Sequence, residues 1–83
     1  MLPTTEDFEK FIRFKFDIAI KEGKDYIDIV SGDIHRELGE YAGENHRMPC
    51  CCDAMYSLMK SDDIIIDAPK KGKGATLKIR YKL

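Results

Sequence analysis

Apolar positions between Thr4 and Gly23 repeat with the period of an α-helix. At 100° per residue, one stripe of the helical wheel holds Phe8, Ile12, Phe16 and Ala19. A second stripe beside it holds Phe11, Phe14 and Ile18. Thr4 followed by Asp7 three residues later has the spacing of a helix N-cap, and Gly23 is a C-terminal stop signal. The pattern predicts a first helix whose first stripe faces the core.

The same segment also alternates between apolar and polar residues, which is the period of a half-buried strand. The apolar members of this alternation are Ile12, Phe14, Phe16, Ile18 and Ile20. Both patterns cannot be used at once. We prefer the helix because the capping signals, the length and the turn-like run Glu22–Asp25 all agree with it.

A strand and a second helix are predicted next. Tyr26–Val30 is short, rich in β-branched residues and alternating, which is typical of a strand. Ser31 is a favourable N-cap, and the negative charge of Asp33 suits the first turn of a helix. We therefore expect the second helix to run from Gly32 to Leu38.

A third helix is predicted to begin near Arg47, after a glycine-containing loop over Gly39–Asn45 and with Pro49 in its first turn. A wheel centred on Met55 predicts an inward side. That side holds Met48, Cys51, Cys52, Met55, Leu58 and Met59. The outward side holds His46, Cys50, Asp53, Ser57 and Lys60.

The C-terminal third predicts a β-hairpin. A strand over Asp62–Ala68 is followed by a glycine-rich basic turn, Pro69–Gly74, and by an alternating strand over Thr76–Leu83. The apolar residues of the last strand are Leu77, Ile79, Tyr81 and Leu83. The residues between them are Lys78, Arg80 and Lys82. We expect one face of this hairpin to lie on the core.

The order helix, strand, helix, turn, helix, hairpin predicts one α+β domain over residues 1–83 with the winged helix-turn-helix architecture. The runs Ser31–Leu38 and Asn45–Pro49 resemble a prokaryotic group of small, mostly uncharacterised winged-helix proteins. In winged helix-turn-helix domains the third helix enters the major groove and the hairpin, or wing, touches the flanking backbone. Two features depart from that pattern: the turn before the third helix is long, and the third helix is not strongly basic.

Composition and charge agree with a DNA-binding protein of the cytoplasm. The chain has 83 residues, 43% apolar and 35% charged, which is ordinary for a soluble globular domain. No stretch is apolar enough to cross a bilayer, and the N-terminus has neither a basic region nor an apolar run typical of a secretory signal. Residues 1–59 carry a net charge of −5 and residues 60–83 a net charge of +4. Phosphate backbones are a common partner for such a basic segment.

The candidate DNA-binding residues fall into two groups. The third helix and its start supply Asn45, His46, Arg47, Cys50, Asp53, Ser57 and Lys60. The hairpin tip supplies Lys70, Lys71 and Lys73. Arg47, Asn45 and Asp53 have donors and acceptors that match guanine, adenine and cytosine. The lysines can contact phosphates, which positions the protein without selecting a sequence.

Catalysis, metal binding and cofactors are not expected. Consecutive helical cysteines at 50–52 diverge by 100° each, so with His35 and His46 they do not converge on one zinc ion. Cys50 near His46 has no third orienting group for nucleophilic catalysis. Gly72–Thr76 lacks the spacing and the following helix of a phosphate loop.

The expected partner is double-stranded DNA. A homodimer through Phe11, Phe14 and Ile18 is a second expectation, because many helix-turn-helix proteins bind paired half-sites as dimers. The near-neutral total charge leaves one alternative function open, a winged-helix module that binds protein instead of DNA.

Overall fold

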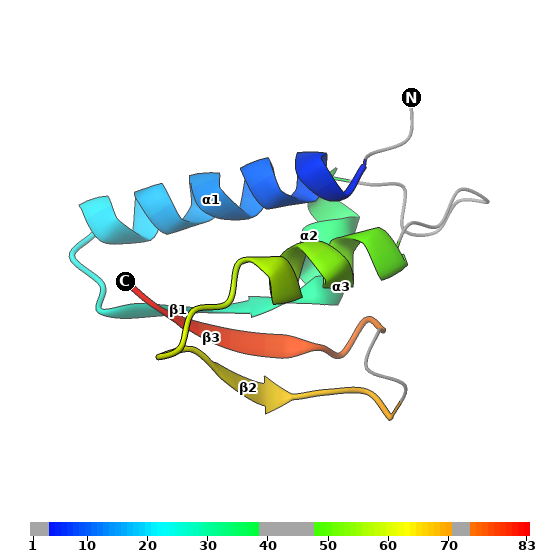
Figure 1. Ribbon diagram of the computed structural model, residues 1–83. Helices are drawn as coiled ribbons and strands as arrows, with labels where there is room; N and C mark the ends of the chain where they lie inside the picture. The colour runs from blue at the N-terminus through cyan, green and yellow to red at the C-terminus, as the bar shows by residue number, and fades with distance from the viewer. Residues whose placement is uncertain (1–3, 39–47, 71–73) are drawn as a thin grey trace.

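The computed structural model describes residues 4–38, 48–70 and 74–83. In these ranges a small α+β fold contains three helices and a three-stranded antiparallel sheet (Figure 1). The elements are α1 (Thr5–Lys21), β1 (Tyr26–Val30), α2 (Ser31–Leu38), α3 (Met48–Ser57), β2 (Ile64–Asp67) and β3 (Lys78–Lys82). This order is the predicted one, and its layout is consistent with a winged helix.

The capping signals decide the conformation of the first segment. The Thr4 side chain accepts a hydrogen bond from the Asp7 amide at 3.2 Å, and the Asp7 carboxylate accepts one from the Thr4 amide at 2.9 Å. This capping box satisfies two amides that a helix start leaves without intrahelical partners. At the other end Gly23 has φ +81°, a left-handed conformation that suits glycine. The predicted helix is confirmed, and the alternative strand is wrong.

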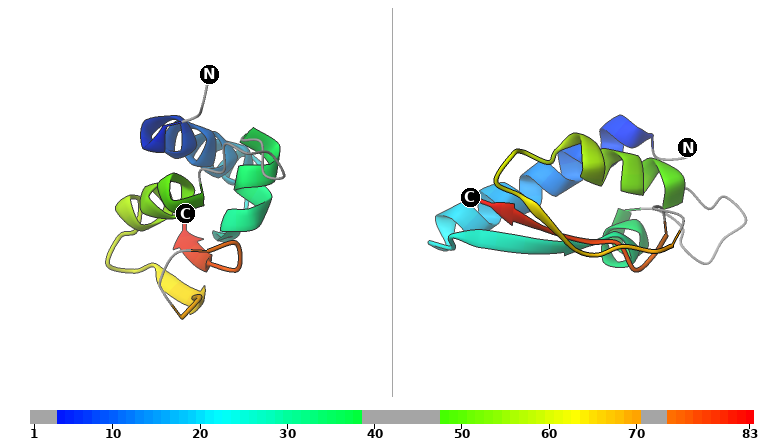
Figure 2. Two further views of the ribbon diagram at one scale, coloured as in Figure 1. Left: turned by 90° about the vertical axis from the view of Figure 1, so that its right-hand side faces the viewer. Right: turned by 60° about the horizontal axis from the view of Figure 1, so that its bottom comes forward.

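Strand β3 lies at the centre of the sheet, in the order β1-β3-β2. Ile79 of β3 is opposite Ile29 of β1 on one side and Ile65 of β2 on the other. The three helices lie on one face of the sheet, and the other face is uncovered by the described residues (Figures 1 and 2). The alternation predicted for the last strand is confirmed, because Ile79 and Tyr81 are fully buried.

Strand β2 does not share this burial, which corrects the expectation that the whole hairpin would rest on the core. Ile64, Ile65 and Ile66 are 52%, 45% and 42% exposed. The reason is position: β2 is the edge strand on the side of the sheet farther from the helices (Figure 2, left). Side chains on both of its faces therefore remain in contact with solvent.

The core forms where α1 and α3 meet the inner face of the sheet. Its buried hydrophobic members are Phe8, Ile12, Ile29, Ile34, Met48, Cys51, Cys52, Ala54, Met55, Leu77, Ile79 and Tyr81. His35 of α2 is also fully buried and stacks on Phe8, with ring centroids 5.7 Å apart. Among the described helices none is both long enough and apolar enough to cross a membrane.

Candidate nucleic-acid interface

The side of α3 that faces away from the core carries three of the predicted contact residues. Asp53 is half-buried there and Ser57 is exposed, whereas Cys50 is half-buried at the border of this side and packs in part against the core. Asn45, His46 and Arg47, predicted to begin the interface, lie outside the described residues, as do Lys71 and Lys73 of the hairpin. The described part of α3 thus brings together Cys50, Asp53 and Ser57.

The described part of this side of α3 has no positive charge of its own, because Met48–Ser57 contains no lysine or arginine. The Ser57 hydroxyl donates to the Glu9 carboxylate of α1 and also lies 2.8 Å from the Ala54 carbonyl. Glu9 was not identified from the sequence, because the contact joins residues 48 positions apart. The Glu9 carboxylate therefore lies near any phosphate that approaches the end of α3, and it opposes binding there.

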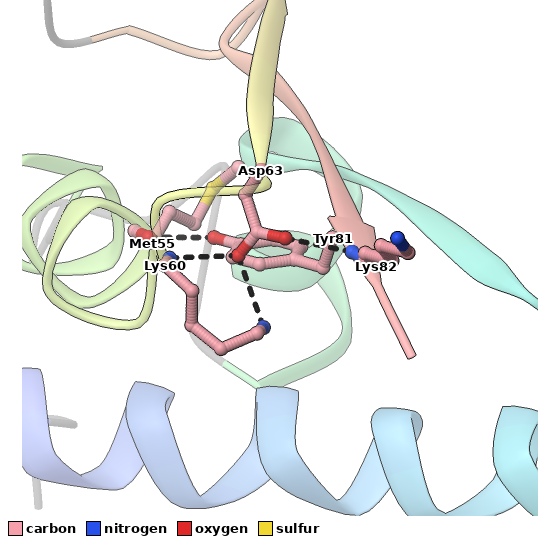
Figure 3. Close-up of polar contacts among 5 residues, drawn as sticks. All are labelled: Met55, Lys60, Asp63, Tyr81 and Lys82. Carbon is pink, nitrogen blue, oxygen red and sulfur yellow. Dashed lines mark hydrogen bonds and ion pairs between the residues drawn. The ribbon is translucent and has the colours of Figure 1, made fainter.

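Lys60 does not belong to the outward side of α3, because the helix ends at Ser57. Its ammonium is 3.0 Å from the Asp63 carboxylate, and its backbone amide donates to the same oxygen at 2.8 Å (Figure 3). The same ammonium lies 6.0 Å from the ring centres of Phe16 and Tyr81. The predicted wheel continued past the true end of the helix and placed Lys60 wrongly. Leu58 and Met59, which were predicted on the inward side, also follow the end of the helix; both are half-buried and pack against the core.

The outer end of the hairpin, at Gly74 and Ala75, is fixed to α2 and α3 by several contacts. The Ser31 hydroxyl donates to the Gly74 carbonyl, and the Gly32 amide donates to the Ala75 carbonyl at 3.0 Å. The Gly74 amide lies 3.3 Å from the Cys52 sulfur. A side chain at Gly32 would not fit, because a Cβ atom there would lie 2.8 Å from the Ala75 oxygen. These contacts hold the outer end of the hairpin beside the first half of α3 (Figure 1).

The basic residues of β3 are partly neutralised. Arg80 donates two hydrogen bonds to Asp28 of β1, at 2.8 and 3.1 Å, and its guanidinium lies 4.3 Å from the centre of the Tyr26 ring. These hydrogen bonds hold the pKa of Asp28 below its ordinary value, against a smaller opposing effect of burial. Lys78 is also 4.0 Å from Asp28. Asp28 therefore offsets part of the positive charge that Lys78 and Arg80 give to β3.

Lys70 is the one predicted hairpin-tip lysine among the described residues, and it is exposed at the end of the hairpin. It lies close in sequence to Lys71 and Lys73. The hairpin tip is consequently the most basic segment of the chain. Since lysine ammonium groups bind phosphates as point charges, this segment is the best candidate contact for a nucleic-acid backbone.

The three cysteines differ in their access to solvent. Cys51 and Cys52 are fully buried, whereas Cys50 is half-buried at the border of the outward side of α3. Burial, with smaller contributions from the neighbouring thiols, raises the pKa of Cys51 to about 12. A thiol with this pKa is almost entirely protonated at neutral pH and reacts slowly.

We expect a thiol reagent such as dithionitrobenzoate to label Cys50 rapidly in the native protein and Cys51 and Cys52 only after unfolding. Absorbance of the released thiolate counts the reacted groups. Cys50→Ser should abolish the rapid phase and leave the slow phase unchanged. Equal and rapid labelling of all three cysteines in the native state would contradict the orientation of α3.

Possible metal ligands are scattered over the described residues. Within 4–38, 48–70 and 74–83, no three His, Cys, Asp or Glu side chains are placed to hold a metal ion. An open hollow of about 420 Å³ lies between β1 and α2. Two of its acidic residues, Asp33 and Glu37, form ion pairs with Arg36 and Lys15 and are exposed. Such pairs are typical of a solvated surface.

Comparison with known proteins gives no family or function for this chain. The chain matches no protein-family model, no curated protein and no solved structure.

Proposed function

We propose that this protein binds double-stranded DNA, as a transcriptional regulator or as a DNA-targeting accessory, with the hairpin tip contacting phosphates and the residues at the start of α3 reading base edges. The observation that carries the proposal is the junction between Gly74 and Cys52, because it places the basic hairpin beside the first half of α3. In a winged helix these two elements contact the same duplex. The roles of Arg47 and Asn45 in base recognition rest on their sequence position alone.

The contacts of α3 also bear on which residues should supply most of the affinity for DNA. Because Glu9 of α1 lies beside Ser57 and Met48–Ser57 contains no lysine or arginine, the last turn of α3 is a poor contact for phosphates. The proposed affinity therefore comes mainly from Lys70, Lys71 and Lys73. These contacts are electrostatic, so binding should weaken steeply as salt concentration rises.

The test is a titration of a fluorescein-labelled duplex of mixed sequence, followed by anisotropy at low and at physiological salt. The triple variant Lys70→Ala, Lys71→Ala, Lys73→Ala should bind every duplex more weakly. The slope of log K against log salt should fall by about one unit for each phosphate contact that is lost. A selected preferred site should in addition lose roughly 1–3 kcal/mol with Arg47→Ala, and other sequences should lose little.

A control variant removes basic residues from the opposite layer of the molecule. Arg13 and Lys24 are exposed and belong to α1 and to the turn after it. Arg13→Ala with Lys24→Ala removes two positive charges from these positions and should leave DNA affinity nearly unchanged. An equal loss in both variants would indicate a nonspecific response to net charge, and absence of salt-sensitive DNA binding in the wild type would overturn the proposal.

A second candidate function is a protein-interaction module. It is favoured by the three exposed isoleucines of β2, Ile64, Ile65 and Ile66, since contiguous exposed apolar residues are typical of protein contacts. The same titration distinguishes the two functions, because an interaction module would show no salt-sensitive affinity for duplex DNA.

A further inference from the structure

Helix α1 has a side that no other described element covers. The helix lies at the outer surface of the molecule, with α2, α3 and the sheet all on its other side (Figures 1 and 2). Phe14 and Ile18 on this side are 57% and 40% exposed. A phenylalanine exposed to this extent beside another exposed apolar residue is unfavourable in water and indicates a contact surface.

Phe11 lies at one border of this exposed surface. Its ring stacks with that of Phe14, with centroids 6.5 Å apart, and the Lys15 ammonium lies 5.2 Å from its centre. Lys15 is in turn paired with Glu37 of α2 at 2.7 Å. Phe11 thus packs against the core and, through Lys15, lies beside α2, whereas Phe14 and Ile18 next to it are exposed.

Charged residues are placed symmetrically about Phe14. Asp7 precedes it by seven residues and Lys21 follows it by seven, and both are exposed. Seven residues are nearly two turns of helix, so the two charges lie on the same side as Phe14, each about 10 Å from it along the axis. Asp7 and Lys21 have opposite charges, which makes the surface complementary to itself.

We propose that a second copy of this chain occupies this surface, with the two α1 helices packed antiparallel about a two-fold axis at Phe14. In that arrangement the two Phe14 rings meet at the axis, and Asp7 of each copy faces Lys21 of the other. Ile18 packs against the aliphatic part of Lys10 of the second copy. A two-fold contact uses the same patch twice, which is what a self-complementary surface requires. The inference is independent of DNA binding.

The dimer is tested by sedimentation velocity from micromolar to near-millimolar concentration. The wild type should show a reversible monomer–dimer equilibrium. Phe14→Ser should remain monomeric throughout this range, because the centre of the contact is lost. Ile64→Ser, which changes a comparably exposed residue on β2, is the matched control and should dimerise like the wild type.

Charge exchange tests the antiparallel register. Asp7→Lys and Lys21→Glu each place like charges opposite each other in a homodimer, so each should self-associate roughly tenfold more weakly than the wild type. In an equimolar mixture of the two variants every facing pair is again opposite in charge, and association should return to the wild-type level. Asp7→Lys also removes the carboxylate that caps the start of α1, so loss of association in this variant alone is not decisive. Because only folded chains can restore association, the mixture separates loss of the contact from loss of the fold.

Three results would overturn the proposal. The wild type could remain monomeric at all concentrations, the mixture could fail to restore association, or Ile64→Ser could dissociate a dimer that Phe14→Ser leaves intact. The last result would place the interface on β2. None of these outcomes depends on whether the protein binds DNA, so the dimer and the proposed function can fail separately.

Discussion

Replacement of Asp63 by alanine is expected to lower the free energy of unfolding by about 3 kcal/mol. The Asp63 carboxylate, 7% exposed as a residue, accepts hydrogen bonds from the Lys60 amide at 2.8 Å and the Lys82 amide at 2.7 Å (Figure 3). It thereby ties the end of β3 to the segment between α3 and β2. Hydrogen bonds to a charged acceptor contribute about 1.5–3 kcal/mol each, and alanine would leave both amides without this acceptor.

Urea denaturation followed by circular dichroism measures this effect. The neighbouring residue offers a matched control, because Asp62 is exposed and Asp62→Ala should change stability by less than about 0.5 kcal/mol. Asp63→Asn retains one acceptor oxygen and should fall between the two. Similar stability for Asp62→Ala and Asp63→Ala would show that the carboxylate does not join these segments.

The same carboxylate makes stability depend on pH. Burial alone would raise the pKa of Asp63, but hydrogen bonds from the Lys82 and Lys60 amides and from the Lys60 ammonium outweigh it and keep the pKa below the ordinary 3.8. Because the folded state binds this proton less tightly than the unfolded state, the contribution is fully present well above pH 3.8. It is lost as pH falls through the lower, folded-state pKa. The wild type should therefore lose more stability in this acid range than Asp63→Asn.

Replacement of Tyr81 by alanine should have a larger effect, about 3–5 kcal/mol. Tyr81 is fully buried at the centre of the sheet, and its ring centre lies 4.8 Å from that of Phe16. Its hydroxyl donates to the Met55 carbonyl at 2.6 Å, which joins β3 to α3. Alanine would remove this hydrogen bond and also leave a cavity the size of an aromatic ring. For a domain of this size the loss approaches the whole expected stability.

Tyr81→Phe separates the two contributions, because it removes only the hydroxyl. We expect it to cost about 1 kcal/mol in thermal or urea unfolding, with the Met55 carbonyl left unsatisfied. Tyr26→Phe is the control, since Tyr26 is 49% exposed. If Tyr81→Ala were no more destabilising than Tyr81→Phe, the ring would not be part of the core.

Local signals were sufficient to predict most of the backbone. The capping box at Thr4 and Asp7 and the glycine at 23 determined the extent of α1, and the strict alternation from Leu77 to Tyr81 determined which side of β3 is buried. Each of these depends on residues close together in sequence. Tertiary contacts did not need to be known.

The errors concern features that local patterns do not contain. A helical wheel has no information about where a helix ends, so it placed Lys60 on the outward side of α3, three residues after the helix had stopped. An apolar run such as Ile64–Ile66 indicates a strand but not its position in the sheet, and an edge position left it exposed. The acidic surroundings of Ser57 arise from Glu9 on a different helix.

The buried carboxylate of Asp63 was missed for a related reason. It stands next to the exposed Asp62 and cannot be distinguished from it by residue type or spacing. Asp63 differs from Asp62 only in the folded protein, where β3 brings the Lys82 amide to 2.7 Å from the Asp63 carboxylate. Residues of this kind can be found from the sequence only once the strand pairing is known.

An NMR titration of the ¹⁵N-labelled protein shows whether the hairpin binds duplex DNA. Spectra are recorded as a mixed-sequence duplex is added at low and at physiological salt. We expect amide shifts concentrated at the outer end of the hairpin, around Lys70 and Gly74, and in the first turns of α3, with smaller shifts at the higher salt. Shifts confined to α1 or β2, or no shifts at either salt concentration, would contradict this expectation.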